Sequence, residues 1–100
     1  MRDEIIVEAG MIHKLKELGV TNAWVIMLYC KILSMSENTG YCTITNEYFA
    51  DLLVKTPRGI QKHLLELKTK GIIKIEVIKE YEDQTGRYVE TSRIYPQIAM

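Results

Sequence analysis

The sequence predicts an α+β fold, with a three-helix core, a small strand and a C-terminal β-hairpin. Residues 45–71 contain two helical patterns with a two-residue turn between them. Residues 23–35 form a third helical segment, in which only one of the thirteen residues is charged. After Gly71, the spacing of apolar residues changes from the helical period to the alternation of a strand.

The first helical pattern in residues 45–71 begins at Thr45. Its hydroxyl is expected to cap the helix, because it can accept a hydrogen bond from an unpaired backbone N–H one turn later. Apolar residues then recur at helical spacing; they are Tyr48, Phe49, Leu52 and Leu53. Residues 54–55 are expected to form the turn that follows.

The second helical pattern has both of its ends marked. Thr56 is expected to cap the helix, and Pro57 suits the first helical position, where no backbone N–H is needed. A stripe of apolar residues at helical spacing faces a core; it consists of Ile60, Leu64 and Leu67. Gly71 supplies the left-handed residue that ends the helix. Two short capped helices joined by a tight turn predict a helix-turn-helix.

The opposite face of the second helix carries the residues that could contact a partner. It presents Arg58, Lys62, Leu65 and Thr69, with Gln61 at its flank. Arg and Gln side chains read guanine and adenine edges in the major groove of DNA, and Lys and Thr bind phosphates. An amphipathic helix also needs a polar outer face simply to be soluble, so this pattern alone leaves both interpretations open.

Charge is distributed unevenly along a chain whose net charge is zero. Residues 55–74 contain six basic residues and one acidic residue, a balance of +5, and the rest of the chain has a balance of −5. A local basic patch of this kind is what a DNA-binding surface requires, although charge runs are more often solvated surfaces.

Length and composition indicate one domain over residues 1–100, with a core at 20–96 and an N-terminal extension at 1–19. Hydrophobic residues make up 47% of the chain, and no apolar run is long enough to span a bilayer. No signal peptide is visible, so we expect a cytoplasmic protein with Cys30 and Cys42 as free thiols.

The N-terminal region allows two elements. Residues 4–8 are rich in β-branched residues and favour a short strand, whereas residues 11–18 favour one or two helical turns closed by Gly19. In those turns we expect the inward-facing residues to be Ile12, Leu15 and Leu18.

Residues 23–35 predict a long helix capped by Thr21 or Asn22. This helix is apolar on nearly all sides, so it is either buried centrally or packs one face against a partner chain. Trp24 is the exposed aromatic residue that favours a homodimer, and Leu65 is a second candidate for that interface.

Residues 41–44 predict a small strand, and residues 72–79 and 87–95 predict the two strands of a hairpin. We expect Ile73, Ile75 and Val77 to share one face.

Helices, a small strand, a helix-turn-helix and a hairpin together make a winged helix. Its cationic wing residues are Lys79 and Arg87. Its acidic residues would be repelled by phosphate, so the wing either stays off the duplex or contacts something else; they are Glu80, Glu82, Asp83 and Glu90.

Several segments of the chain together match the pattern of one family; they are residues 28–35, Gly40-Tyr41-Cys42, residues 46–52, residues 60–67, Gly71-Ile72-Ile73 and Arg93-Ile94-Tyr95. With these segments the chain resembles the N-terminal winged-helix domains of replication initiators (replisome organisers) from phages and plasmids of Gram-positive bacteria. The resemblance covers residues 20–96. It implies that the second helix binds short repeated sites in double-stranded DNA, and that a separate C-terminal segment assembles replisome proteins. Because the chain ends five residues after Tyr95, we expect a domain of a longer protein or a small stand-alone protein of a mobile element.

The expected function is therefore sequence-specific binding of double-stranded DNA. The candidate DNA-binding residues are Thr45, Asn46, Lys55, Thr56, Arg58, Gln61, Lys62, Thr69, Lys79 and Arg87. A transcription regulator of the same fold and a protein-interaction or dimerisation module are the alternatives. A weaker alternative is binding of single-stranded nucleic acid, whose bases would stack on a platform of tyrosine rings. The residues of that platform would be Tyr81, Tyr88 and Tyr95. We expect no enzyme activity, cofactor, metal or membrane association, because no phosphate loop, ligand cluster or nucleophile–base pair is visible.

Overall fold

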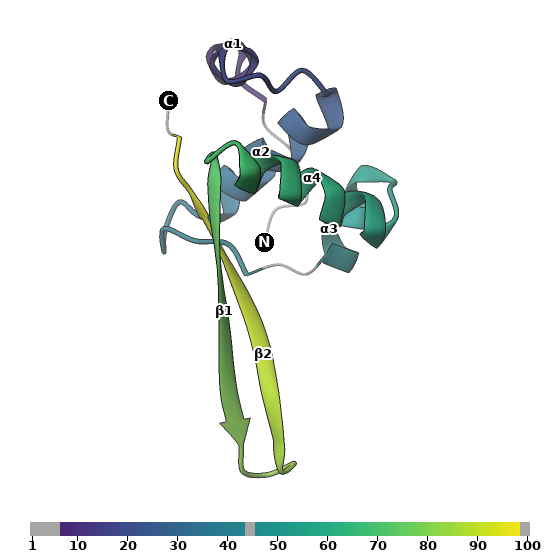
Figure 1. The fold of residues 1–100 in the computed structure, drawn as a ribbon, viewed down its shortest axis with the longest axis vertical. Helices are drawn as coiled ribbons and strands as arrows, with labels where there is room; N and C mark the ends of the chain where they lie inside the picture. The colour runs from purple at the N-terminus through teal and green to yellow at the C-terminus, as the bar shows by residue number, and fades with distance from the viewer. Residues whose placement is uncertain (1–6, 44–45, 99–100) are drawn as a thin grey trace.

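The computed structural model describes residues 7–43 and 46–98 (Figure 1). The helices and strands in this part of the chain are α1 (Ala9–Glu17), α2 (Ala23–Met35), α3 (Asn46–Leu53), α4 (Pro57–Thr69), β1 (Ile73–Glu82) and β2 (Arg87–Pro96). The helices form the core and the strands form an antiparallel hairpin that projects from it (Figure 1). The fold is the α+β winged helix-turn-helix that the sequence predicted.

Helix α2 is the central helix, as its apolar composition predicted. Its N-cap is Asn22, whose Oδ1 accepts a hydrogen bond from the backbone N–H of Trp24 at 2.8 Å. The helix ends at Met35, and its C-cap residue is Ser36, whose hydroxyl donates a hydrogen bond to the carbonyl oxygen of Ile32 at 2.6 Å. Most of its side chains are buried, including that of Lys31.

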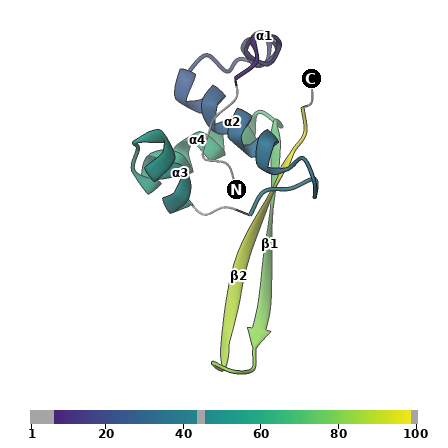
Figure 2. The same ribbon diagram turned by 180° about the vertical axis from the view of Figure 1, so that it is seen from behind.

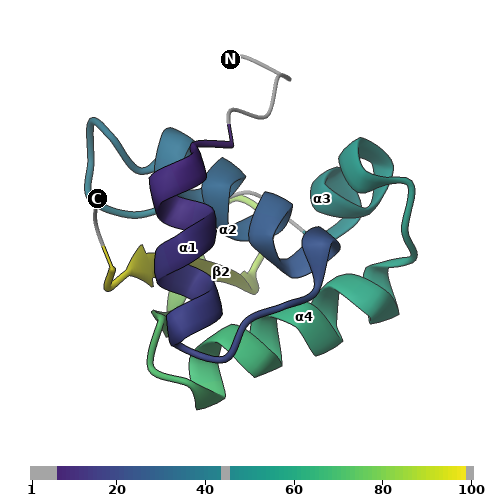
Figure 3. The same cartoon turned by 90° about the horizontal axis from the view of Figure 1, so that it is seen from above.

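One hydrophobic core joins the helices and the base of the hairpin. Figure 3 shows α4 along one side of α2, with α3 beside the end of α4 where the chain turns. The buried hydrophobic side chains among the described residues are Met11, Leu15, Val20, Val25, Ile26, Leu28, Tyr29, Cys30, Ile32, Cys42, Phe49, Ala50, Leu53, Ile60, Leu64, Leu67, Ile72, Ile73 and Ile94. Cys30 and Cys42 are both buried and neither forms a disulfide, as expected.

Helix α1 is longer than predicted, and two of its three predicted inward-facing residues, Ile12 and Leu15, do pack on the core. Met11 and Leu15 are buried, whereas Leu18 is 40% exposed, so the prediction that Leu18 faces inward is wrong. The helix ends at Glu17, and Leu18 lies in the turn that leads to Gly19, where φ is +89°. Of the alternative strand over residues 4–8, residues 4–6 lie outside the described residues, and the other two precede α1 as irregular backbone.

The small strand predicted at residues 41–44 is reduced to a single bridge. Cys42 and Ile94 exchange two backbone hydrogen bonds of 2.8 Å, which adds one residue pair beside β2. The bridge stops there because Tyr41 lies in a bend, where its carbonyl oxygen accepts a hydrogen bond from the Thr39 hydroxyl at 2.9 Å. Ile44, the last residue of the predicted strand, lies outside the described residues.

The hairpin is longer than the sequence predicted. Its register runs from Ile73 opposite Pro96 to Glu82 opposite Arg87, and Gly86 closes the turn with a φ of +66°. Figures 1 and 2 show it extending away from the helices, which gives the molecule its long axis of 47 Å. Val77 is exposed, although it was expected to face inward with Ile73 and Ile75, because the strand leaves the core after Ile75.

No helix in the described ranges is both long enough and apolar enough to cross a membrane.

Candidate nucleic-acid interface

The turn between α3 and α4 lies at the position that the sequence predicted and has the predicted Thr56 cap. Val54 has a positive φ of 53°, and the backbone N–H of Lys55 returns to the carbonyl oxygen of Ala50 at 2.8 Å. The Thr56 hydroxyl accepts a hydrogen bond from the N–H of Gly59 at 3.1 Å, and Pro57 occupies the first turn. These hydrogen bonds fix the orientation of α4 relative to α3.

Helix α4 has one buried face and one exposed face. Ile60, Leu64 and Leu67 are buried, as the apolar stripe predicted. The exposed side chains on the other side include all those proposed from the sequence; they are Arg58, Gln61, Lys62, Leu65 and Thr69. We call the surface formed by Arg58, Lys62, Leu65 and Thr69 the outer face of α4. Gln61 lies at its flank, where Lys68 is also exposed.

Lys55, in the turn before α4, packs against α2. Its ammonium nitrogen is 4.8 Å from the centre of the Trp24 ring, a cation–π contact between the turn and the start of α2. Trp24 is still 38% exposed. The contact therefore holds the ammonium group of Lys55 on the α2 side of the turn.

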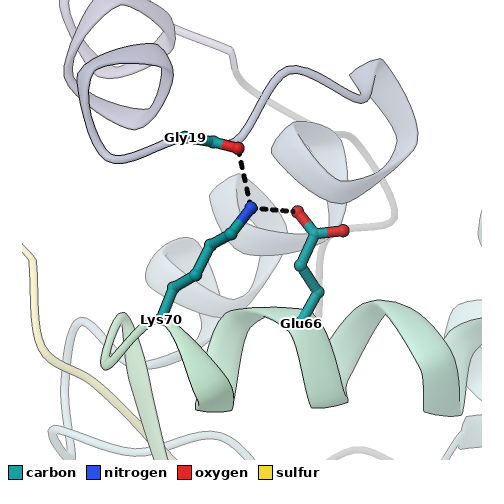
Figure 4. Close-up of polar contacts among 3 residues, drawn as sticks. All are labelled: Gly19, Glu66 and Lys70. Atoms are coloured by element: carbon teal, nitrogen blue, oxygen red, sulfur yellow. Dashed lines mark hydrogen bonds and ion pairs between the residues drawn. The ribbon is translucent and has the colours of Figure 1, made fainter.

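Lys70 counts toward the basic patch in the sequence but is occupied in the structure. Figure 4 shows its ammonium group between the carboxylate of Glu66, at 3.1 Å, and the carbonyl oxygen of Gly19, at 2.7 Å. The positive charge of Lys70 is therefore paired and turned toward the α1–α2 connection. The balance of +5 counted over residues 55–74 in the sequence is therefore larger than the positive charge that the surface of α4 presents to a partner.

His63 lies at the boundary between the core and the surface of α4. Its side chain is half-buried, and its covered Nε2 has no hydrogen-bond partner among the described residues. Burial lowers the pKa of His63 below its ordinary value; Lys55 lowers it further and Glu66 acts in the opposite direction. The imidazole is consequently neutral at physiological pH.

Residues 25–73 match the family model for a helix-turn-helix domain. The structure of this segment is that of a helix-turn-helix. It begins in α2 and ends at the first residue of β1, so α2, α3 and α4 form the matched part. Neither the curated proteins nor the solved structures gave a match. A helix-turn-helix domain with a basic second helix indicates binding to DNA.

Two of the expected DNA contacts are Thr45 and Asn46, at the start of α3 in the sequence. Thr45 lies outside the described residues, so its predicted cap and phosphate contact stay predictions. Asn46 is the first residue of α3, but its side chain is not among those that the structure describes.

The wing residues proposed for DNA contact lie apart from α4. Lys79 is paired in register with Glu90, and Arg87 with Glu82, on the half of the hairpin that extends beyond the core (Figure 1). The structure therefore does not bring Lys79 and Arg87 together with Arg58 or Lys62. Each of these wing cations sits opposite an acidic residue in the strand pairing.

The three tyrosines proposed as a stacking platform belong to two separate sites. Tyr81 and Tyr88 pair across the hairpin, with ring centres 5.3 Å apart. Tyr95 instead packs against Tyr41 at the base of the hairpin, with ring centres 5.6 Å apart. The single platform is therefore wrong, because the strand register separates Tyr95 from the other two by more than half of the hairpin.

Sequence reasoning missed the cluster that Arg93 forms with Tyr41 and Tyr95. The Arg93 guanidinium carbon is 4.6 Å from the centre of the Tyr41 ring. A hydrogen bond to Tyr95 is the main cause that raises the pKa of Arg93. The spacing of Arg93 and Tyr95 already placed them on one face of a strand. Tyr41 joins Arg93 and Tyr95 because its neighbour Cys42 pairs with Ile94 in an isolated β-bridge. No pattern in the sequence predicts that pairing.

Proposed function

We propose that this helix-turn-helix domain binds double-stranded DNA sequence-specifically, with the outer face of α4 in the major groove. The observation that carries the proposal is the exposure of Arg58, Gln61 and Lys62 on a helix held in place by a capped turn. The buried stripe on the other side anchors that helix to the core, so the outer face is presented rigidly.

The position of each residue supports a distinct role. Arg58 and Gln61 are in the N-terminal half of α4, which is the part that contacts base edges in helix-turn-helix proteins. Lys55, Lys62 and Thr69 are suited to phosphate groups on either side of the groove.

The residues next to the helix starts would add backbone contacts. Thr56 accepts a hydrogen bond in its cap and keeps its hydroxyl proton to donate to a phosphate oxygen. Thr45 and Asn46, at the start of α3, are assigned to phosphate contacts because helix N-termini favour anions. Lys79 and Arg87 are the remaining candidates, and they depend on the wing approaching the duplex.

We assign the process to replication initiation in a phage or plasmid, supported by the family resemblance of residues 20–96. Regulation of transcription is the competing process, because the same fold serves both. Selection of bound sites from a random duplex pool, followed by location of those sites on the source replicon, separates the two. Sites repeated within one origin support initiation, and sites placed at promoters support regulation.

Fluorescence anisotropy tests the binding itself, with labelled random duplex and labelled single strand titrated at several salt concentrations. We expect the duplex to bind and its affinity to fall with salt, with a log–log slope that corresponds to several phosphate contacts. Tighter binding of the single strand, or no binding of either at low salt, would contradict the proposal.

Exposed apolar residues favour a protein-interaction module as the second candidate function. Leu65 is 61% exposed in the middle of the outer face of α4, where a purely DNA-reading surface would carry a polar side chain. If α4 docks only a protein, Leu65→Ala abolishes that association, and Arg58→Ala leaves it intact.

A further inference from the structure

The end of the hairpin is an acidic surface with two exposed aromatic rings. We call residues 79–90 the wing tip. It contains two basic residues and four acidic residues, Glu80, Glu82, Asp83 and Glu90. Tyr81 is 56% exposed and Tyr88 is 74% exposed, and their rings contact each other edge to face. This combination is unfavourable for phosphate and favourable for a basic protein surface with an apolar centre.

The wing tip has no cover within the described part of the chain. Ile75 is the last hairpin residue of β1 that packs on the core, and the residues from Lys79 to Tyr88 are all exposed. A two-stranded hairpin with both faces in water is marginally stable on its own. The exposed strands and rings are therefore a surface that gains stability when another molecule covers them.

The outer face of α4 has the complementary character. Leu65 is at its centre, with the positive charges of Arg58 and Lys62 nearby on the same helical face. Glu66 is the single acidic residue of α4, and its carboxylate is paired with Lys70. The face therefore offers an apolar centre within a positive surface, whereas the wing tip offers an aromatic pair within a negative one.

These two surfaces cannot meet within one molecule. β1 begins just after the C-terminal end of α4, and the hairpin then runs away from the helices (Figures 1 and 2). Strands of ten residues extend by roughly 33 Å, which carries the tip well clear of its own α4. Any contact between the two surfaces must therefore join two copies of the chain.

We propose that the wing tip of one copy docks on the outer face of α4 of a second copy. Tyr81 and Tyr88 cover Leu65, and the tip carboxylates lie within a Debye length of Arg58 and Lys62. Each copy then uses two different surfaces, so the contact is head-to-tail and leads to open chains of molecules instead of a closed dimer.

Such docking would cover the helix that the proposed function places in the major groove. Self-association and duplex binding should then compete. This competition rests on the proposed function, whereas the association itself does not require DNA.

Sedimentation velocity without DNA tests the association over a wide range of protein concentration at low and high salt. We expect wild-type protein to sediment faster as its concentration rises, and high salt to remove this effect. Leu65→Ser removes the helix surface, and the double variant Tyr81→Ser/Tyr88→Ser removes the tip. Leu18→Ser is the matched control, because it removes an exposed leucine from a different surface. Circular dichroism verifies that each variant is folded.

Mixing the two variants gives the decisive result. Each is expected to be monomeric alone, but the intact tip of one can dock on the intact helix of the other. The mixture should therefore form dimers and nothing larger. A wing-to-wing contact would instead leave Leu65→Ser able to assemble alone, which would overturn the proposal.

Two further results would also overturn the proposal. Wild-type protein could remain monomeric at every concentration, or the Tyr81→Ser/Tyr88→Ser variant could lose affinity for duplex while assembly is unchanged. The second result would mean that the wing tip contacts DNA. The anisotropy titration distinguishes failure of the docking proposal from failure of the proposed function. Self-association without duplex binding would contradict only the proposed function. Duplex binding by a protein that stays monomeric would contradict only the docking.

Discussion

The ammonium group of Lys70, at the end of α4, donates a hydrogen bond to the carbonyl oxygen of Gly19 at 2.7 Å. The two residues are 51 positions apart in the sequence. Gly19 is in the connection after α1, where its φ is positive, and its carbonyl oxygen faces the end of α4. The contact therefore attaches the N-terminal helix, which lies outside the matched helix-turn-helix segment, to the helix proposed to bind DNA.

Removal of the Lys70 ammonium should destabilise the fold modestly. Lys70→Met keeps the aliphatic stem and loses both polar contacts, so we expect a loss of about 1 kcal/mol in the free energy of unfolding, measured with urea. Glu66→Gln is the control, because it retains the bond to Gly19 and should cost about 0.5 kcal/mol or less. Equal losses for the two variants would mean that the Gly19 contact contributes nothing.

Truncation of Leu15 should show that α1 belongs to the core. The side chain is fully buried, so Leu15→Ala is expected to cost about 2–5 kcal/mol. Leu18→Ala, at an exposed position of similar chemistry, should change the free energy of unfolding by only about 0.5 kcal/mol. Thermal or urea unfolding measures both. If Leu15→Ala behaved like Leu18→Ala, α1 would not be packed in solution as the structure describes.

His63 should make stability depend on pH. Its pKa in the folded protein is below the ordinary value of 6.5, because burial and Lys55 disfavour the charged form. Between the two pKa values the unfolded chain binds more protons at His63 than the folded protein does. The contribution of His63 to the free energy of unfolding is therefore complete above pH 6.5 and is lost as the pH falls below 6.5.

The measurement is the midpoint of thermal unfolding at a series of pH values from neutral to acidic, for wild type and for His63→Gln. We expect the wild type to lose stability more steeply below pH 6.5 than His63→Gln does, because the glutamine side chain binds no proton. His13→Gln is the control; it replaces an exposed imidazole that pairs with Glu17 and leaves His63 in place. Parallel profiles for wild type and His63→Gln would remove His63 as the cause.

Local patterns were sufficient to predict the helix-turn-helix. Thr56, Pro57 and Gly71 act through bonds and dihedral angles within a few residues, so their effect does not depend on the rest of the fold. Leu18 was misplaced because the helical period was extended one residue past the point where the backbone turns at Gly19. Val77 was misplaced because alternation identifies a face of a strand but not the position where that strand leaves the core.

The charge of the candidate site was harder to predict, because it depends on pairing between distant residues. Lys70 looked like part of the basic surface until the structure placed Gly19 and Glu66 beside it. The Tyr41 ring joined Arg93 through a single bridge between segments more than fifty residues apart. Such contacts are tertiary, and neither propensity nor periodicity contains them.

Substitutions on α4 should separate base contacts from phosphate contacts. Arg58→Ala is expected to cost about 1–3 kcal/mol with the selected duplex and to relax specificity at one base pair. Lys62→Ala should weaken all duplexes alike and lower the salt slope by about 1. Lys16→Ala is the matched control, because it removes one exposed positive charge from α1 and leaves the outer face of α4 intact.

Anisotropy titrations of the three variants with selected and random duplex give the comparison. Lys16→Ala should bind both duplexes as wild type does, since net charge alone does not position α4. If Arg58→Ala lost equal affinity for selected and random duplex, Arg58 would be a phosphate contact instead of a base-reading residue. If Lys16→Ala weakened binding as much as Lys62→Ala did, attraction to DNA would depend on total charge and α4 would have no special place in it.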